Sequence, residues 1–352
     1  MRGRAFPGNG PDVEARYARA GHWLLAAIFE NDQAKEWCQS NGVPLRKAAT
    51  ESIGTGGAFL VPTDLANAIL DLRDTYGAFR RRARIVPMAS DNTTVPRRPG
   101  GTGAFFMAEN SAGTETGANV DNISLTAKKI GSLIRISSEL EEDAAVDMVD
   151  FVANEIAFAF AQKEDDCAFN GDGTSTYGKM YGIGQIVLDG NHSQAKVTAA
   201  SGHNTFLTLD ATDLGNLIKA VQAAAIPNGA WFCSQTAFAQ TFCRLAAGGD
   251  GYMDTRIVNG ISTPFYLGFP VILTQKFPLI STTLTGKTMM AFGDMYLGAA
   301  LGERRGLTLA RSPERYLDQD QIAVLGTERF HSVIHNIGDN TNPGALAALV
   351  AP

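Results

Sequence analysis

The longest periodic segment of the chain lies at 146–169. Apolar side chains recur there at helical spacing and line one face: Val149, Val152, Ala153, Ile156, Ala157, Phe160 and Cys167. One of two serines, Ser137 or Ser138, is a candidate N-cap, Glu141 is placed to complete a capping box, and Gly171 supplies the terminal turn. At about 1.5 Å per residue the helix would extend on the order of 36 Å, enough to cross a whole domain.

The N-terminal region combines one amphipathic helix with an extended arm. Residues 12–38 carry apolar side chains at helical spacing, and no neighbouring segment of the sequence offers a partner for that face. Residues 43–57 are small or polar and have no helical or strand period. We therefore expect an arm that must lie on another surface, followed by a short strand and a helix around 63–72.

Residues 87–128 have a different character, because proline and glycine interrupt short strand-like pieces. This pattern predicts a long hairpin with a mobile tip. Excursions beyond roughly 15 residues in a compact domain are usually functional or disordered. Since glycines make the hairpin pliant, it could adapt to a neighbour.

The second half of the chain alternates helical and strand patterns. Helices are predicted at 210–225 and 236–245, and strands at 183–188, 230–233, 271–274, 288–292, 307–309 and 321–324. Residues from 336 onward are polar and then alanine-rich, which we interpret as a tail. The fold class is therefore α+β.

Composition narrows the function. The 352 residues are 45% hydrophobic, and the formal net charge is −6. The pI is about 5.4, whereas a protein that binds nucleic acid tightly is expected to be basic, so tight nucleic-acid binding is disfavoured. The four cysteines have no CxxC spacing and indicate reduced thiols. No apolar segment at the N-terminus is long enough for a signal region or a membrane span, so we expect a soluble protein with no membrane partner.

Two motifs invite an enzymatic interpretation. Residues 173–179 match GxxxxGK, but Met180 stands where a phosphate loop needs a hydroxyl, and a long helix precedes the motif where a buried strand is required. His331 and His335 lie four apart near Glu328, a metal-ligand spacing on a helix, but residues 327–336 favour a strand and supply no third ligand close by. We predict neither a cofactor nor a metal.

Nucleophilic catalysis has no support either. No serine lies in a Gly-x-Ser-x-Gly elbow, and Cys167 falls on the apolar helix face, where a small buried hydrophobe is the default. We therefore predict no catalytic residues and a protein that is not an enzyme.

Arginines cluster before and within the hairpin, with two open interpretations: a solvated face, or one side of an inter-subunit contact. The cluster comprises Arg80, Arg81, Arg82, Arg84, Arg97 and Arg98. Its natural counterpart is the acidic start of the long helix: Glu139, Glu141, Glu142 and Asp143. These ten residues are the candidates for contact between subunits.

Several short pieces, in order, resemble the major capsid proteins of tailed bacteriophages with the Hong Kong 97 fold. The pieces are Gly56-Gly57 to Val61-Pro62, Ile136 to Leu140 with Asp143, Asn170 to Thr174, Gly182-Ile183, Leu267 to Val271, Gly293-Asp294 with Tyr296, Arg305-Gly306, Ser312, Tyr316, Asp320-Gln321, Ala323 and Arg329. Each piece alone is weak, but their order and spacing cover roughly 52–333.

The resemblance implies a domain plan. It assigns 1–57 to an N-terminal arm with its helix, 58–86 and 129–195 to a peripheral domain with the long spine helix, and 87–128 to an extended loop. It further assigns 196–306 to an axial domain, 307–335 to strands returning to the peripheral domain, and 336–352 to a C-terminal tail.

The resemblance also implies a function. Such subunits form pentamers and hexamers that close into an icosahedral shell around double-stranded DNA, in a virion assembled in the host bacterial cytoplasm with portal, scaffold and decoration proteins. An encapsulin-like nanocompartment shell, which encloses protein cargo, is the alternative. Residues 90–127 contain no lysine, so we expect no covalent cross-linking of the kind that joins a loop lysine to a neighbour's asparagine. A scaffolding segment of the kind found in relatives is also absent, which favours a separate scaffold protein or a processed chain.

Overall fold

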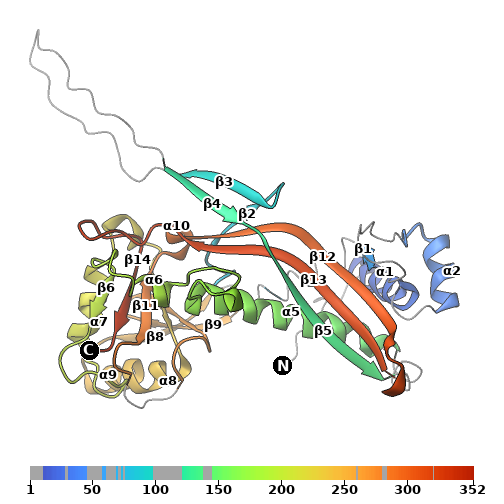
Figure 1. Ribbon diagram of the computed structural model, residues 1–352. Coiled ribbons are helices and arrows are strands. Elements are labelled where there is room, and N and C mark those ends of the chain that lie inside the picture. The colour runs from blue at the N-terminus through green and yellow to red at the C-terminus, as the bar shows by residue number, and fades with distance from the viewer. Residues whose placement is uncertain are drawn as a thin grey trace, which may run out of the picture.

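The computed structural model describes residues 11–27, 31–45, 58–60, 69, 73, 76–97, 121–137, 145–258, 261–279, 284–319 and 321–352. Within them the chain forms a seven-stranded sheet, a five-stranded sheet, a two-stranded sheet and one long helix. A long ribbon of strands extends away from the seven-stranded sheet (Figure 1). The long helix runs along this ribbon, and the N-terminal helices lie toward its far end.

The long helix is α5, Ala145–Asn170. Its buried side chains include Val152, Ile156 and Phe160, which confirms the predicted apolar face. The helix ends at Gly171, where a Cβ would lie 2.5 Å from the carbonyl oxygen of Cys167 and 2.6 Å from that of Met180. Only glycine fits this close approach. The predicted N-cap lies outside the described residues.

The ribbon is the five-stranded sheet. Its order is β1 (Ala58–Leu60), β12 (Ala299–Tyr316), β13 (Gln321–Ile334) and β5 (Lys128–Ser137), and β2 (Arg84–Pro87) pairs parallel to the start of β12. The antiparallel register of β12 and β13 runs from Ala299 opposite Ile334 to Tyr316 opposite Gln321. A short 3₁₀ turn, η4 (Leu317–Gln319), follows β12 at the turn of this hairpin. The strands predicted at 307–309 and 321–324 are therefore parts of two much longer strands.

The base of the predicted hairpin is a two-stranded sheet of β3 (Asn92–Arg97) and β4 (Asp121–Thr126). Met88, Ile123, Leu125 and Ala127 form a small buried cluster beneath it. The hairpin pairing at its base confirms this part of the prediction. Its tip, 98–120, lies outside the described residues.

The seven-stranded sheet carries the second core. Its order is β6 (Lys196–Thr198), β14 (Leu346–Val350), β11 (Thr288–Gly293), β7 (Ala230–Cys233), β10 (Phe269–Leu273), β9 (Ile261–Tyr266) and β8 (Met253–Val258). The helical segments that accompany it are α7 (Ala211–Lys219), η2 (Ala223–Ala225), α8 (Gln235–Ala237), η3 (Phe238–Cys243), α9 (Arg244–Gly248) and α10 (Met295–Gly298). Trp231 is fully buried, with its ring centroid 4.5 Å from that of Phe292.

Two predictions in this half are wrong. Residues 336–352 are not a tail, because β14 lies between β6 and β11 and all five of its residues are buried. A strand buried on both faces shows no alternation, so its alanine-rich sequence gave no strand signal. Residues 183–188 contain the short helix α6 (Ile183–Ile186), followed by a turn, where a strand was expected. The 3₁₀ turn η1 (Ser175–Tyr177) lies between α5 and α6.

The N-terminal region forms two helices, α1 (Pro11–Ala27) and α2 (Asp32–Ser40), where a single helix was predicted. Asn31 caps α2 by accepting a hydrogen bond from the Ala34 N–H at 3.1 Å. Trp23 of α1 joins Ile156 of α5 in one buried cluster, so a segment distant in sequence packs against this helix. The arm at 46–57 and most of the predicted helix at 63–72 lie outside the described residues.

Candidate assembly surfaces and the buried charge cluster

Arg80 does not contribute to an exposed arginine face. Its side chain is only 4% exposed and lies between two carboxylates of the same chain. Its Nη1 is 3.4 Å from Glu164 Oε1, and its Nη2 is 2.9 Å from Glu303 Oε2. Arg80 is therefore a buried structural group, and its proposed role in contact between subunits is corrected.

The other described arginines of the predicted contact group lie at the surface or near it. Arg81 is exposed and donates to the Gly77 carbonyl oxygen at 2.9 Å, and Arg84 is exposed on β2. Arg82 is half-buried, and burial together with neighbouring Arg81 lowers its pKa. Arg97 pairs with Asp121 across the hairpin base at 2.6 Å. Arg98, Glu139, Glu141, Glu142 and Asp143 lie outside the described residues, so the predicted pairing between the two groups stays a prediction.

Arg80 belongs to a buried group of five ionisable residues, which we call the Arg73 cluster: Arg73, Arg80, Glu164, Glu303 and Glu328. Arg73 is 1% exposed. Its Nη1 donates to Glu328 Oε2 at 2.5 Å and lies 3.7 Å from Glu303 Oε1, and its Nη2 donates to Glu164 Oε1. The cluster thus joins Arg73, the turn at Arg80, helix α5 and both strands of the β12–β13 hairpin.

Burial governs the electrostatics of the Arg73 cluster. Burial raises the pKa of Glu328 to about 8 and also raises the pKa of Glu164, although Arg73 opposes both shifts. Burial acts to raise the pKa of Glu303 too, but Arg80 and Arg73 outweigh it and lower that pKa. A buried carboxyl with few cationic partners keeps its proton more readily than an exposed one. Glu328 is that group here.

Sequence reasoning missed this cluster. Its members are scattered from 73 to 328, and Glu328 was considered only as a neighbour of two histidines. The available signal was that Glu328 is the one charged residue among the alternate positions 324 to 334, which form the buried side of β13. Buried charges are almost always paired, so such a position predicts an unseen partner.

His331 lies on β13 and His335 follows directly after its last residue, which confirms the predicted strand and not the helix that metal spacing requires. Burial lowers the pKa of His331 and of His335 to about 4, so both are neutral near pH 7. The Nδ1 atom of each is buried without a hydrogen-bond partner. Glu328 is three residues from His331, hence on the opposite face of the strand, where it binds Arg73.

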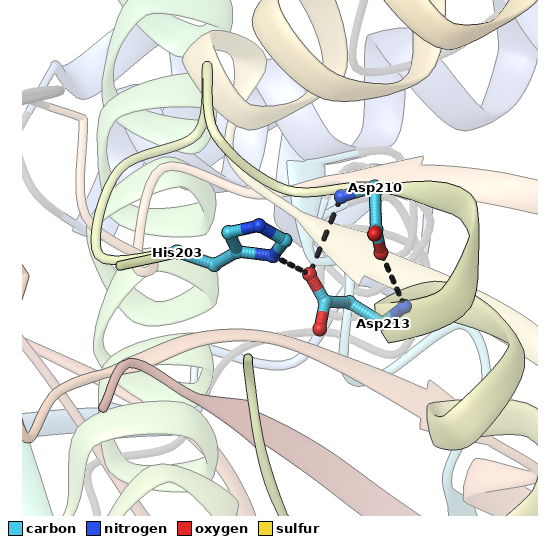
Figure 2. Close-up of side chains that lie close together, drawn as sticks. All are labelled: His203, Asp210 and Asp213. Atoms are coloured by element: carbon cyan, nitrogen blue, oxygen red, sulfur yellow. Dashed lines mark hydrogen bonds and ion pairs between the residues drawn. The ribbon is translucent and has the colours of Figure 1, made fainter. Parts of the chain in front are cut away.

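A second group of potential metal ligands is explained by helix capping. His203, Asp210 and Asp213 lie close together at the start of α7 (Figure 2). The Asp213 N–H donates to Asp210 Oδ1 at 2.8 Å, and the Asp210 N–H donates to Asp213 Oδ2 at 3.3 Å, which is a capping box. His203 Nδ1, at 2.6 Å, and the Ala200 N–H, at 3.0 Å, occupy the Asp213 oxygens as well. Both Asp213 oxygens are therefore already engaged.

The phosphate-loop match also has a structural explanation. The N–H of Gly173 donates to the Met180 carbonyl at 3.0 Å, and the N–H of Lys179 donates to the Thr174 carbonyl at 2.8 Å. A phosphate loop needs its amides free to cradle the ligand. Here they close the turn that ends α5.

Exposed apolar side chains mark the rims of the described surface. Strand β8 is an outer strand of the seven-stranded sheet, and its Ile257 is 80% exposed. Tyr252, the residue before the first residue of β8, is 67% exposed. Leu133 on the outer strand β5 and Tyr296 on α10 are also exposed. Long outer strands with apolar side chains are ready templates for contact with another chain.

No helix in the described part of the chain is long and apolar enough to cross a membrane. The described residues combine a long helix, the base of a hairpin and two larger sheets. The sequence profile of the phage capsid family matches residues 57–336, and the chain belongs to this family.

Individual relatives agree with that assignment. The major capsid protein of Klebsiella oxytoca phage phiKO2 is 30% identical over 158 residues, which cover 45% of this chain. The match spans about a third of that relative's length, 35%.

Solved shells show the same fold, which confirms the Hong Kong 97-type prediction. The capsid of an empty GTA particle matches with a TM-score of 0.57 and 19% identity, covering 90% of this chain and 98% of that one. The chain from Mycobacterium phage Adephagia matches with a TM-score of 0.54 and 14% identity, covering 78% of this chain and 90% of that one. The holo-SrpI encapsulin of Synechococcus elongatus PCC 7942 matches with a TM-score of 0.50 and 13% identity, covering 90% of this chain and 94% of that one.

Proposed function

We propose that this chain is the major capsid protein of a tailed bacteriophage, a structural protein that assembles with copies of itself into a closed shell. The observation that carries the proposal is the family match over 57–336, together with a fold that solved phage capsids share along most of the chain. The curated relative is itself a major capsid protein.

The described surface supports self-assembly. Strands β5 and β8 end their sheets without a further strand in the described part of the chain, and both carry exposed apolar side chains. Such edges are a liability for a solitary protein but suit a subunit that is covered by neighbours.

The finer part of the proposal is an icosahedral shell of pentamers and hexamers around double-stranded DNA in a virion assembled in the bacterial cytoplasm. Portal, scaffold and decoration proteins would be its partners. A net charge of −6 suits a container from which DNA must be released, because strong phosphate binding needs a basic surface. The protein would have no catalytic role.

Particle contents test this proposal. Particles purified from producing cells are treated with nuclease, separated on a density gradient and analysed for DNA and protein. Nuclease-protected double-stranded DNA in shells of this chain is the expected result. Shells that hold a defined protein cargo and no DNA would support the encapsulin alternative, and a chain that sediments only as a monomer would exclude both.

A further inference from the structure

The Arg73 cluster has more acidic groups than basic ones. Two guanidiniums, those of Arg73 and Arg80, face three carboxyls, those of Glu164, Glu303 and Glu328. If all five were ionised, these described residues would together carry a net charge of −1. The side chains of Arg73, Glu164 and Glu328 are each at most 1% exposed, and only Glu303, at 19%, reaches water, so an excess charge on Glu164 or Glu328 is not stabilised by solvent.

The geometry indicates where a compensating proton resides. Glu164 Oε1 interacts with both Arg73 and Arg80, and Glu303 also faces both. Glu328 binds Arg73 alone, through Oε2. Its other oxygen, Oε1, is buried and accepts no hydrogen bond. A proton on that oxygen removes the excess charge. The Glu328 carboxyl then adds to the larger effects of Arg80 and Arg73, which lower the pKa of Glu303 against its burial.

We infer that the Arg73 cluster binds one exchangeable proton, which the Glu303–Glu328 pair holds. While the proton is bound, the cluster holds the spine helix against the β12–β13 hairpin, and loss of the proton weakens this contact. We call this arrangement the one-proton latch. The latch is a property of the folded subunit and goes beyond the proposed shell function. Glu328 faces Arg73, Glu164 on α5 and Glu303 on β12. On β5 the residue opposite Glu328 in the register is the uncharged Ile130.

The latch has a defined pH dependence. The pKa of Glu328 is raised in the folded state to about 8, while in the unfolded chain a glutamate has a pKa of about 4.3. Between these values the folded state holds one proton more than the unfolded state. Stability from this group is therefore fully present below about pH 4 and is lost as the pH rises through about 8, and the folding equilibrium constant falls about tenfold per pH unit.

The test is urea unfolding of the purified full chain at pH 6, 7, 8 and 9. Wild type is compared with Glu328→Gln, with Glu303→Gln, and with Glu155→Gln, an exposed glutamate on the same helix as Glu164. Taking ratios to wild type at each pH cancels the contributions of all other titrating groups. Either cluster variant leaves two carboxylates for two guanidiniums and so needs no extra proton.

We expect the ratio of folding constants, variant over wild type, to rise about ninefold from pH 6 to 7 and about fivefold from pH 7 to 8 for either cluster variant, and to level off by pH 9. For Glu155→Gln it should stay constant. A constant ratio for both cluster variants would overturn the latch. If neither variant folds, the folding constant of the wild type alone must fall about fivefold between pH 7 and 8, and a flat profile there would overturn the proposal equally.

Discussion

Arg97, the last residue of β3, donates a hydrogen bond to the backbone carbonyl oxygen of His335, just after the end of β13. The same guanidinium pairs with Asp121 on β4 at 2.6 Å. One side chain therefore links the two strands of the hairpin base and ties them to the body of the subunit. The hairpin would thus leave the subunit from a fixed point.

Replacing Arg97 by alanine should loosen this base. We expect the free energy of unfolding to fall by only about 1 kcal/mol, because the pair with Asp121 is partly exposed. Amide hydrogen exchange in β3 and β4 should nevertheless become clearly faster. Arg256→Ala, which removes the exposed pair with Asp254 on β8, is the matched control and should leave exchange in the hairpin base unchanged. Equal exchange in both variants would show that Arg97 does not anchor the hairpin.

Two glycines should respond in opposite directions to substitution by alanine. At Gly171 the new Cβ meets two backbone carbonyl oxygens, and we expect a loss of about 2 kcal/mol or more. At Gly215 in α7 a Cβ has nothing within 4 Å, so alanine should add about 0.5 to 1 kcal/mol through helix propensity. Urea unfolding measures both. A neutral Gly171→Ala would contradict the close turn at the end of α5.

The C-terminal strand should be as sensitive as any core element. Leu349 is fully buried in β14, and Leu349→Ala should cost about 2 to 5 kcal/mol. Leu207→Ala, at a leucine that is 56% exposed, should cost far less. Thermal unfolding followed by circular dichroism compares the two. Similar, small effects would indicate that 346–350 form a dispensable tail after all.

Acid should destabilise the subunit through two half-buried histidines. His331 and His335 have pKa values near 4 in the folded state, against about 6.5 when unfolded. Below pH 6.5 the unfolded chain takes up protons that the folded chain does not. Stability from these groups is therefore present above pH 6.5 and is lost as the pH falls toward 4, by about 2 kcal/mol each after allowance for partial exposure.

The double variant His331→Gln/His335→Gln checks this. The difference in the free energy of unfolding between variant and wild type should be constant from pH 7 to 8 and should shift in favour of the variant between pH 6.5 and 4. A difference that stays constant across the acid range would mean that the histidines reach water in the folded state.

Sequence patterns predicted some elements well, and the reasons are physical. Helix α5 was predictable because Val152, Ile156 and Phe160 repeat at helical spacing along a half-exposed helix. The base of the hairpin predicted at 87–128 was predictable because prolines and glycines separate two short strand-like pieces. Strand β14 was not, because both of its faces are buried and no alternation arises. The break between α1 and α2 was missed because their apolar positions continue in one period.

The buried charge cluster could not be predicted at all from local pattern. Arg73 and Glu328 are 255 positions apart, and only the completed fold brings them together. Arginines close in sequence also have different roles, since Arg80 is buried while Arg81 beside it is exposed. The run of arginines at 80–84 therefore indicated a region rich in charge. It did not indicate which of these arginines are exposed and could contact a neighbouring subunit.

The most direct test of the account is an electron cryomicroscopy reconstruction of particles formed by this chain. We predict closed icosahedral shells in which the subunit of Figure 1 fits the density, with Ile257 of β8 and Leu133 of β5 covered by neighbouring copies. Flat assemblies that do not close, or particles in which these side chains remain exposed to solvent in every copy, would contradict the assignment of these strand edges to assembly. A protein that stays monomeric under all assembly conditions would contradict the central claim.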